Sequence, residues 1–390
     1  MKIAAVVAEY NPFHNGHRYH LEETRRRGAD HIVVIMSGTA VQRGDIAVFD
    51  KYARADIAVK NGADLVIELS CPFSCSGAEV FAGAAVQLMA GLGEGVVEVL
   101  SFGCEDDELD TLVRCAEVSE RLSNSDKVKH LIAQGRSYPS SVAAAAEDDD
   151  VRRTLSSPNN VLAVEYIKAI RKYAPWISPC AVKRHLCAHD SMKAESDYAS
   201  GSLIRQRLAD GYDIAAYVPK VPEGKGYFLK NADKVLLYKI MTAGEELGSL
   251  PDMNPALLNR FADLRDRGGF ATAEEFLAVL KNKNITLARL RRSLMHLALG
   301  IRAEDIRPVP YGRILAFNKA GCGILSAAKE RTLTFDTSLA RLEKLSPYSA
   351  RVCELETNAV RFQQLCTLGR PCFLSEYRRK ITLSDDQQRR

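Results

Sequence analysis

Short apolar runs alternate with helical stretches over the first 110 residues of the chain. The apolar runs predict strands at residues 3–9, 31–37, 64–69 and 96–102, with helices at residues 16–27 and 50–61. Apolar strands separated by helices indicate right-handed βαβ crossovers, so we expect a parallel sheet with helices on both faces. Ligands bind beyond the carboxyl ends of such strands, which directs the search for chemistry to the segments after Glu9, Ile35 and Leu100.

A segment rich in proline and glycine, residues 217–226, divides the chain into two parts. Before it, the sequence Ser157-Pro158-Asn159-Asn160 is typical of a helix start and precedes a predicted helix at 161–173, a strand at 181–185 and a helix at 200–208. After it, the pattern predicts helices at 232–243, 254–267, 272–281 and 286–299. We therefore expect an α/β domain over residues 1–216 and a mostly α-helical domain over residues 227–390.

The composition indicates a globular protein without a membrane-spanning segment. The 390 residues, 46% of them hydrophobic, leave room for two domains with a sizeable core. No apolar run reaches the roughly 18 residues that a membrane span needs, and the apolar residues 3–8 are too few for a signal peptide, so we expect a cytoplasmic location. The ten cysteines lack the repeated CxxC spacing of a zinc site, so we expect buried apolar cysteines and no protein-bound metal.

The net charge of +4 is unevenly distributed along the chain. Residues 1–210 carry 24 basic and 29 acidic side chains, whereas residues 211–390 carry 29 basic and 20 acidic side chains. A basic half joined to an acidic half suggests that the C-terminal part meets a polyanion.

The most specific motif is Glu9-Tyr10-Asn11-Pro12-Phe13-His14-Asn15-Gly16-His17, which follows the first predicted strand and opens the first predicted helix. A helix N-terminus offers unpaired N–H groups and partial positive charge to a phosphate, and Gly16 lets the backbone approach a nucleotide closely. The two imidazoles of this HxGH element can donate hydrogen bonds to an α-phosphate while pyrophosphate is displaced. The alternative is that both histidines only cap the helix or bind a metal.

A second candidate phosphate site is Ser200-Gly201-Ser202-Leu203-Ile204-Arg205, late in the α/β domain. It looks like the hydroxyl- and arginine-bearing motif with which HxGH nucleotidylyltransferases bind the β- and γ-phosphates. The alternative is an ordinary helix cap by a serine.

With these motifs, the sequence resembles the bacterial tRNA(Met) cytidine acetate ligase family of the HxGH nucleotidylyltransferase superfamily. The resemblance also covers Met36-Ser37-Gly38, Val41-Gln42-Arg43-Gly44, Asp50-Lys51 with Arg54, Ser101-Phe102-Gly103 and segments of the C-terminal half. It implies a Rossmann-like nucleotidylyltransferase domain followed by a helical domain. It also implies a two-step reaction: acetate attacks ATP to give acetyl-adenylate, and the exocyclic amine of the wobble cytidine of elongator tRNA(Met) then takes the acetyl group.

The resemblance further implies the site residues. His14 and His17 would stabilise the transition state, and the ATP contacts would be Val7, Ala8, Glu9, Tyr10, Asn11, Pro12, Phe13, His14, Asn15, Gly16, His17, His20, Gly103, Asn159 and Arg184. Asn159 could instead cap the following helix. Arg43, Lys51, Ser202 and Arg205 are further candidates for phosphate binding. Mg²⁺ is expected as the counter-ion of ATP, because hard phosphate oxygens prefer it.

A basic cluster in the C-terminal half is the candidate tRNA contact, comprising Lys281, Lys283, Arg289 and Arg292. Such side chains would bind RNA phosphates and position the substrate without specifying it. The alternative is a solvated helix face, which is the usual state of such a cluster.

Two other functions stay open from the sequence alone. One is a small-molecule nucleotidylyltransferase of the same superfamily that makes a cofactor precursor, which would leave the basic half unexplained. The other is a non-catalytic RNA-binding protein with a relic nucleotide fold, against which the complete His14, Gly16 and His17 set argues.

Overall fold

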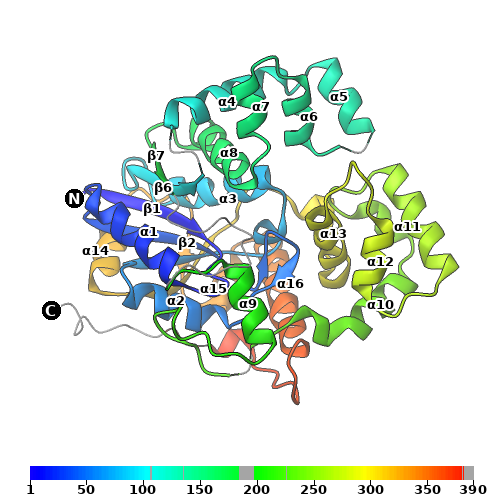
Figure 1. Ribbon diagram of the computed structural model, residues 1–390. Helices are drawn as coiled ribbons and strands as arrows, with labels where there is room; N and C mark the ends of the chain where they lie inside the picture. Colours follow the sequence, from blue (N-terminus) through cyan, green and yellow to red (C-terminus); the bar gives the residue numbers. More distant parts are fainter. Residues whose placement is uncertain (106–107, 135, 184–196, 225, 380, 382–390) are drawn as a thin grey trace.

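The computed structural model describes residues 1–105, 108–134, 136–183, 197–224, 226–379 and 381. Its centre is a seven-stranded sheet in the order β7-β6-β1-β2-β5-β8-β9 (Figure 1). The strands are β1 (Ile3–Ala8), β2 (His31–Ser37), β5 (Leu65–Leu69), β6 (Val99–Cys104), β7 (Ser178–Lys183), β8 (Gly312–Phe317) and β9 (Phe335–Asp336). The first five strands of the order are parallel, which confirms the predicted α/β class.

Helices cover both faces of this sheet because successive side chains of each strand point to opposite faces. Val33 and Ile35 of β2 lie in one cluster with α3 (Ala78–Gly91) and α8 (Pro158–Tyr173). Ile32 and Val34 lie in another cluster with α1 (Asn15–Arg26) and α2 (Lys51–Lys60). Both faces are therefore buried, which explains why β1 and most of β2 are continuous apolar runs.

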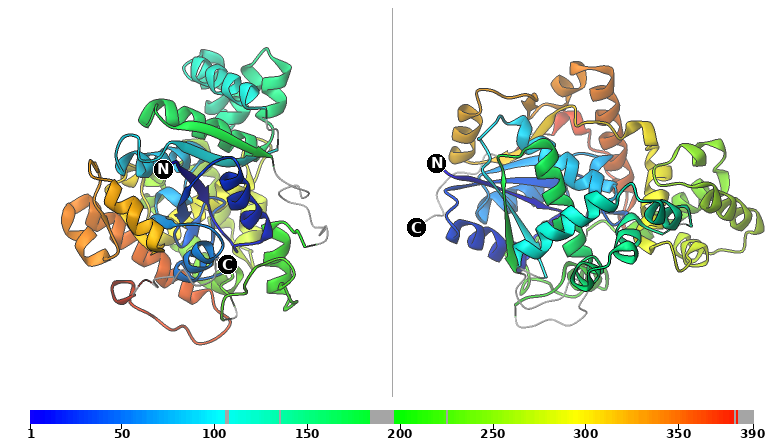
Figure 2. Two further views of the ribbon diagram at one scale, coloured as in Figure 1. Left: turned by 90° about the vertical axis from the view of Figure 1, so that its left-hand side faces the viewer. Right: turned by 90° about the horizontal axis from the view of Figure 1, so that it is seen from above.

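Two groups of helices extend away from the sheet (Figures 1 and 2). The first contains α4 (Leu109–Leu122), α5 (Asp126–Ala133), α6 (Tyr138–Ala145) and α7 (Asp149–Thr154). The second contains α10 (Asp233–Thr242), α11 (Pro255–Arg267), α12 (Ala273–Leu280) and α13 (Leu287–Leu299). A small antiparallel pair, β3 (Ala40–Val41) and β4 (Asp45–Ile46), lies between the sheet and α13. The side-chain amide of Asn284 donates to the carbonyl of Gln134 over 2.9 Å and so joins the two groups.

The structure differs from the predicted division into two consecutive domains. β8 pairs antiparallel with β5, so residues far beyond the predicted boundary complete the first sheet. The segment that follows contains α14 (Lys319–Ala327) and α15 (Leu339–Leu342), and then α16 (Pro347–Leu365). Val352 of α16 belongs to the core of the sheet, whereas Phe362 belongs to the core of the α10–α13 group. The last long helix therefore packs into both parts.

The predicted elements agree with the structure to within a few residues where local chemistry sets their ends. The carboxylate of Asp50 accepts the N–H of Tyr52 and starts α2, and the hydroxyl of Ser200 accepts the N–H of Leu203 and starts α9 (Gly201–Ala209). No helix within the described ranges combines the length and the apolar character that crossing a membrane would require.

Candidate active site

A cavity of about 240 Å³ opens at the carboxyl ends of β1, β6 and β7. The first turns of α1, α8 and α9 border it, through Gly16, Asn159 and Ser200. Helix N-termini carry unpaired N–H groups and partial positive charge, so three of them around one cavity suit a ligand that carries phosphates.

Many of the predicted ATP and phosphate contacts line this cavity. They are Val7, Ala8, Glu9, His14, Gly16, His17, His20, Arg43, Gly103 and Asn159. Asn159 also donates its side-chain amide to Glu105 over 2.9 Å. Arg184 lies outside the described residues.

The other predicted residues of the turn lie behind the cavity wall and shape it. The rings of Tyr10 and Phe13 are buried edge to face, with centroids 4.7 Å apart. The side-chain carbonyl of Asn11 accepts the N–H of Val48 over 2.9 Å. Asn15 donates its side-chain amide to the carbonyl of Ala216 over 3.0 Å. Pro12 is likewise absent from the described lining, so these five predicted contacts support the turn.

The two histidines of the motif stack on each other. Their ring centroids lie 3.6 Å apart with an interplanar angle of 24°. The N–H of His14 donates to Nδ1 of His17 over 3.2 Å. In the neutral ring that contact assigns the proton of His17 to Nε2, which makes Nε2 a hydrogen-bond donor.

The second motif lies beside the first. A Cβ added to Gly201 would lie 4.0 Å from Nε2 of His14, so the start of α9 adjoins the histidine pair. Arg205 donates to the carbonyl of Asn11 over 2.8 Å and to the hydroxyl of Ser202 over 3.2 Å. Ser200 is among the residues that line the cavity. Ser202 and Arg205 are not among them, although they belong to the same helix start.

Glu9 is held from the loop that contains β3 and β4. Its carboxylate Oε1 accepts a hydrogen bond from the N–H of Gln42 over 2.9 Å. Its backbone carbonyl accepts a hydrogen bond from Nη1 of Arg54 over 2.6 Å. Burial raises the pKa of the Glu9 carboxyl, while the charges of Arg205 and Arg43 act in the opposite direction. The end of β1 and this loop thus form one wall of the cavity.

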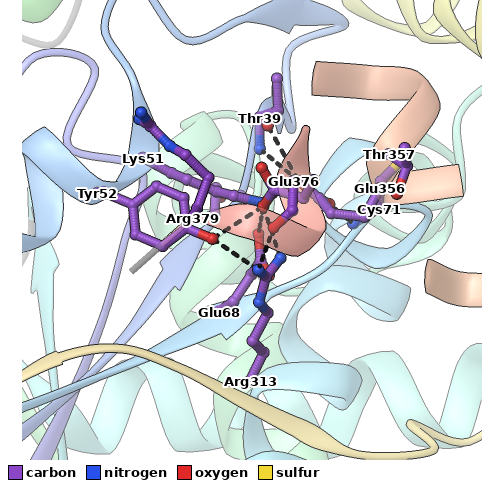
Figure 3. A network of polar contacts seen from close by, with 12 residues as sticks. Thr39, Lys51, Tyr52, Glu68, Cys71, Arg313, Glu356, Thr357, Glu376 and Arg379 are labelled. Atoms are coloured by element: carbon purple, nitrogen blue, oxygen red, sulfur yellow. Dashed lines mark hydrogen bonds and ion pairs between the residues drawn. The ribbon is translucent and has the colours of Figure 1, made fainter. Parts of the chain in front are cut away.

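The prediction that Lys51 binds phosphate is not supported by its position. Lys51 is buried, and its Nζ lies 2.6 Å from Glu68, 2.9 Å from Glu356 and 2.6 Å from Glu376. Arg313 completes this group, which we call the Lys51 cluster, at 2.6 Å from Glu376; Figure 3 shows these side chains pointing toward one another. Burial opposes the charge of Lys51, but the three carboxylates raise its pKa, so it neutralises carboxylates instead of a phosphate.

The predicted tRNA contacts divide into two kinds. Lys281 and Lys283 are exposed. Arg289 donates to the carbonyl of Asp252 over 2.5 Å. Arg292 is largely buried and donates to the carbonyl of Gln42 over 3.3 Å, which ties it to the cavity wall and removes it from the set of surface contacts.

Several cavity residues escaped the sequence reasoning because they resemble core residues. Phe102 of β6 and Tyr166 of α8 line the cavity with ring centroids 5.7 Å apart. Apolar and aromatic side chains on strands and helices give the same sequence pattern whether they face a core or a ligand cavity. Other such residues are Phe81, Leu162, Val182 and Tyr198.

Comparison with known proteins agrees with this geometry. Residues 1–372 match the family HIGH Nucleotidyl Transferase. The chain is 33% identical to the tRNA(Met) cytidine acetate ligase of Clostridium tetani, over 85% of this chain and 88% of that protein. It is 32% identical to that of Clostridium acetobutylicum, over 98% of this chain and 100% of that protein.

Solved structures are similar over the whole chain. Thermotoga maritima TmcAL in its apo form superposes with a TM-score of 0.90 at 26% identity, covering 99% of this chain and 100% of that one. TmcAL bound with alpha-thio ATP superposes with a TM-score of 0.87 at the same identity and coverage. The resemblance seen in the sequence is confirmed: the chain belongs to the tRNA(Met) cytidine acetate ligase family of HIGH nucleotidyl transferases.

Proposed function

We propose that this chain is an ATP-dependent ligase that acetylates the wobble cytidine of elongator tRNA(Met). In the first step, acetate attacks the α-phosphorus of ATP, giving acetyl-adenylate and pyrophosphate. In the second step, the exocyclic amine of the cytidine takes the acetyl group and AMP leaves. The observation that carries the proposal is the cavity in which His14, His17 and the first turns of α1, α8 and α9 meet. That TmcAL of the same fold binds alpha-thio ATP supports it.

The cavity offers suitable groups for the first step. His17, whose Nε2 carries the proton, can donate to the α-phosphate as charge develops on its oxygens. Arg43 and Lys183 add cationic groups to the lining, and the helix N-termini supply N–H groups for the remaining phosphates. Phe102 and Tyr166 supply apolar surface for the adenosine.

Mg²⁺ is proposed only as the partner of the ATP phosphates. Among the described residues there is no group of three or more histidine, cysteine or acidic side chains that could hold a metal ion. When bound, Mg²⁺ would neutralise the charge of the ATP phosphate oxygens, which it prefers as hard ligands. The cytoplasmic location and the tRNA contacts at Lys281 and Lys283 stay predictions from the sequence.

Acetate-dependent exchange of labelled pyrophosphate into ATP tests the first step, and mass-spectrometric detection of acetylcytidine in tRNA(Met) tests the second. We expect exchange with acetate, and acetylcytidine when tRNA is added. Turnover without acetate but with a nucleotidyl acceptor would instead indicate a small-molecule nucleotidylyltransferase. Tight tRNA binding without any exchange would indicate a non-catalytic RNA-binding protein.

A further inference from the structure

Glu9 carries the only carboxylate among the described residues that line the cavity. Its side chain is partly exposed. Oε1 accepts the N–H of Gln42 over 2.9 Å, and no hydrogen-bond donor to Oε2 is found within the described part of the chain. One oxygen therefore fixes the group while the other is available to a ligand in the cavity.

The second proposed step releases a proton inside this cavity. A neutral amine that attacks an acyl carbon becomes positively charged, and it must lose a proton before the amide is stable. A positioned side chain that accepts such a proton accelerates the step by about 10²–10⁴-fold. The cavity must therefore supply an acceptor, or leave the proton to water.

Two of the three cavity histidines, His17 and His20, each have a ring nitrogen already engaged by a neighbour. Nδ1 of His17 already accepts the N–H of His14, so the neutral ring has only a donor left. Nε2 of His20 pairs with the hydroxyl of Ser101 over 2.9 Å. A carboxylate has a second acceptor oxygen, so Glu9 keeps acceptor capacity at Oε2 although Oε1 accepts the N–H of Gln42.

The surrounding structure holds Glu9 in place on both sides. Arg54 binds its carbonyl over 2.6 Å and fixes the end of β1. Gln42 binds the carboxylate of Glu9 through its N–H. The backbone carbonyl of Gln42 in turn accepts a hydrogen bond from Nη1 of Arg292 over 3.3 Å. Gly44 packs directly against the backbone of α13 at Arg291 and Arg292. Catalytic groups need this kind of support from rigid elements.

We propose that Oε2 of Glu9 accepts the proton of the attacking cytidine amine during acetyl transfer, an inference that rests on the proposed function. The amine nitrogen bonds to the acetyl carbon, and the bond from that carbon to the phosphate oxygen breaks, so that AMP leaves with the electron pair. The proton passes from nitrogen to Glu9 and then to water, which restores the carboxylate. Arg292 acts in this step only as a positioning residue.

The pH dependence of transfer follows from the groups around Glu9. They are Arg205 on α9, Arg43 and Gln42 on the β3–β4 loop, Arg54 on α2, Tyr166 on α8 and Cys75 beside α3. Burial raises the pKa of Glu9 above its usual value of 4.5, against the opposing positive charges. The base form is present above that pKa, so transfer should fall as the pH drops through it.

The decisive experiment supplies chemically synthesised acetyl-adenylate and tRNA(Met) to excess enzyme, and measures single-turnover formation of acetylcytidine against pH. We expect Glu9→Gln to transfer at least about 10²-fold more slowly than the wild type and to lose the acid limb of the profile. Its acetate-dependent pyrophosphate exchange should fall far less. Glu9→Asp keeps a carboxylate and should be slow but retain the limb. Glu22→Gln, an exposed carboxylate on α1 paired with Arg18, is the matched control and should behave as the wild type.

Each outcome decides between a catalytic and a structural role. Equal loss of exchange and transfer in Glu9→Gln, or transfer at the wild-type rate with an intact acid limb, would overturn the role of Glu9. If Glu9→Gln does not fold, the pH profiles of the wild type and of Glu9→Asp decide instead. The absence of an acid limb from either profile would also overturn the role of Glu9. A wild-type enzyme that forms no acetylcytidine from acetyl-adenylate would overturn the proposed function itself.

Discussion

Glu356 on α16 binds Thr39, which lies 317 positions earlier in the chain, through both the N–H and the hydroxyl of that residue, over 3.2 and 3.0 Å. The same carboxylate accepts the N–H of Cys71 over 2.8 Å and pairs with Lys51. Thr39 begins the loop that brings Gln42 and Arg43 to the cavity. The last long helix therefore anchors a wall of the site built by the first strands.

Replacing Lys51 by Met should destabilise the whole fold. The change leaves Glu68, Glu356 and Glu376 buried without their shared cation, and breaking a buried ion pair in this way costs about 3–5 kcal/mol. Urea unfolding followed by circular dichroism measures the loss. Lys60→Met removes an exposed pair with Asp56 and should cost about 1 kcal/mol or less. Similar losses in both variants would contradict a structural role for the Lys51 cluster.

The stability of the protein should depend on pH through Glu68. Burial and the neighbouring charge of Glu356 raise the pKa of Glu68 to about 7, above its usual value of 4.5. A raised folded pKa gives stability that is fully present below the unfolded value and is lost as the pH rises through the folded value. Burial opposes ionisation of Glu356, but Lys51 and the N–H of Cys71 lower its pKa to about 2, so its own contribution is lost only in stronger acid.

The variant Glu68→Gln isolates this effect because its amide cannot ionise. Relative to the variant, the wild type should lose free energy of unfolding between about pH 5 and pH 7, at up to about 1.4 kcal/mol per pH unit. Urea titrations of both proteins at a series of pH values measure the difference. A difference that stays constant over this range would show that Glu68 is already ionised in the folded protein.

The sequence pattern was sufficient wherever local chemistry determines structure. The apolar run of β2 predicted the strand His31–Ser37, and the motif at His14–His17 indicated the cavity. β8 was not predicted, because Arg313 interrupts its apolar pattern and becomes buried only through partners from distant segments. Lys51 was misassigned for the same reason: a lysine beside a phosphate-binding loop gives no local sign that Glu356 and Glu376 will surround it.

Gly44→Ala should displace the loop that carries Gln42. Gly44 has a φ of 75°, and an added Cβ would overlap the backbone nitrogen of Arg292. We expect overpacking to lower the free energy of unfolding by about 1–3 kcal/mol, in addition to the cost of a positive φ at alanine. The displaced loop should also raise the KM for ATP. Gly211→Ala is the matched control, since its φ is 80° and nothing lies within 4 Å of the added atom. Equal losses of stability in thermal unfolding would rule out the predicted contact with α13.

Exposed and buried basic residues of the α10–α13 group should affect different measurements. Replacing Lys281 and Lys283 by Ala should weaken tRNA binding. Binding then releases fewer counter-ions from the RNA, so the slope of log affinity against log salt concentration should fall by up to about two units. Arg292→Ala should instead slow the transfer of acetyl from supplied acetyl-adenylate, because Arg292 holds Gln42, which in turn binds the carboxylate of Glu9. Filter binding at several salt concentrations tests the first expectation. An unchanged affinity in the double variant would assign both lysines to a merely solvated surface.

His17→Ala should slow the formation of acetyl-adenylate without unfolding the protein. The hydrogen bond from the N–H of His14 to Nδ1 leaves the proton of His17 on Nε2, and removing one such donor to a developing charge costs about 10²–10³ in rate. Pyrophosphate exchange at saturating ATP and acetate measures the loss, and thermal unfolding checks the fold. His130→Ala is the control: this exposed histidine on α5, whose ring hydrogen-bonds to the side chain of Gln134, lies outside the cavity lining, so the change should leave exchange intact. Near-normal exchange in His17→Ala would mean that the charge on the α-phosphate is stabilised by the helix N-termini and the cationic side chains alone.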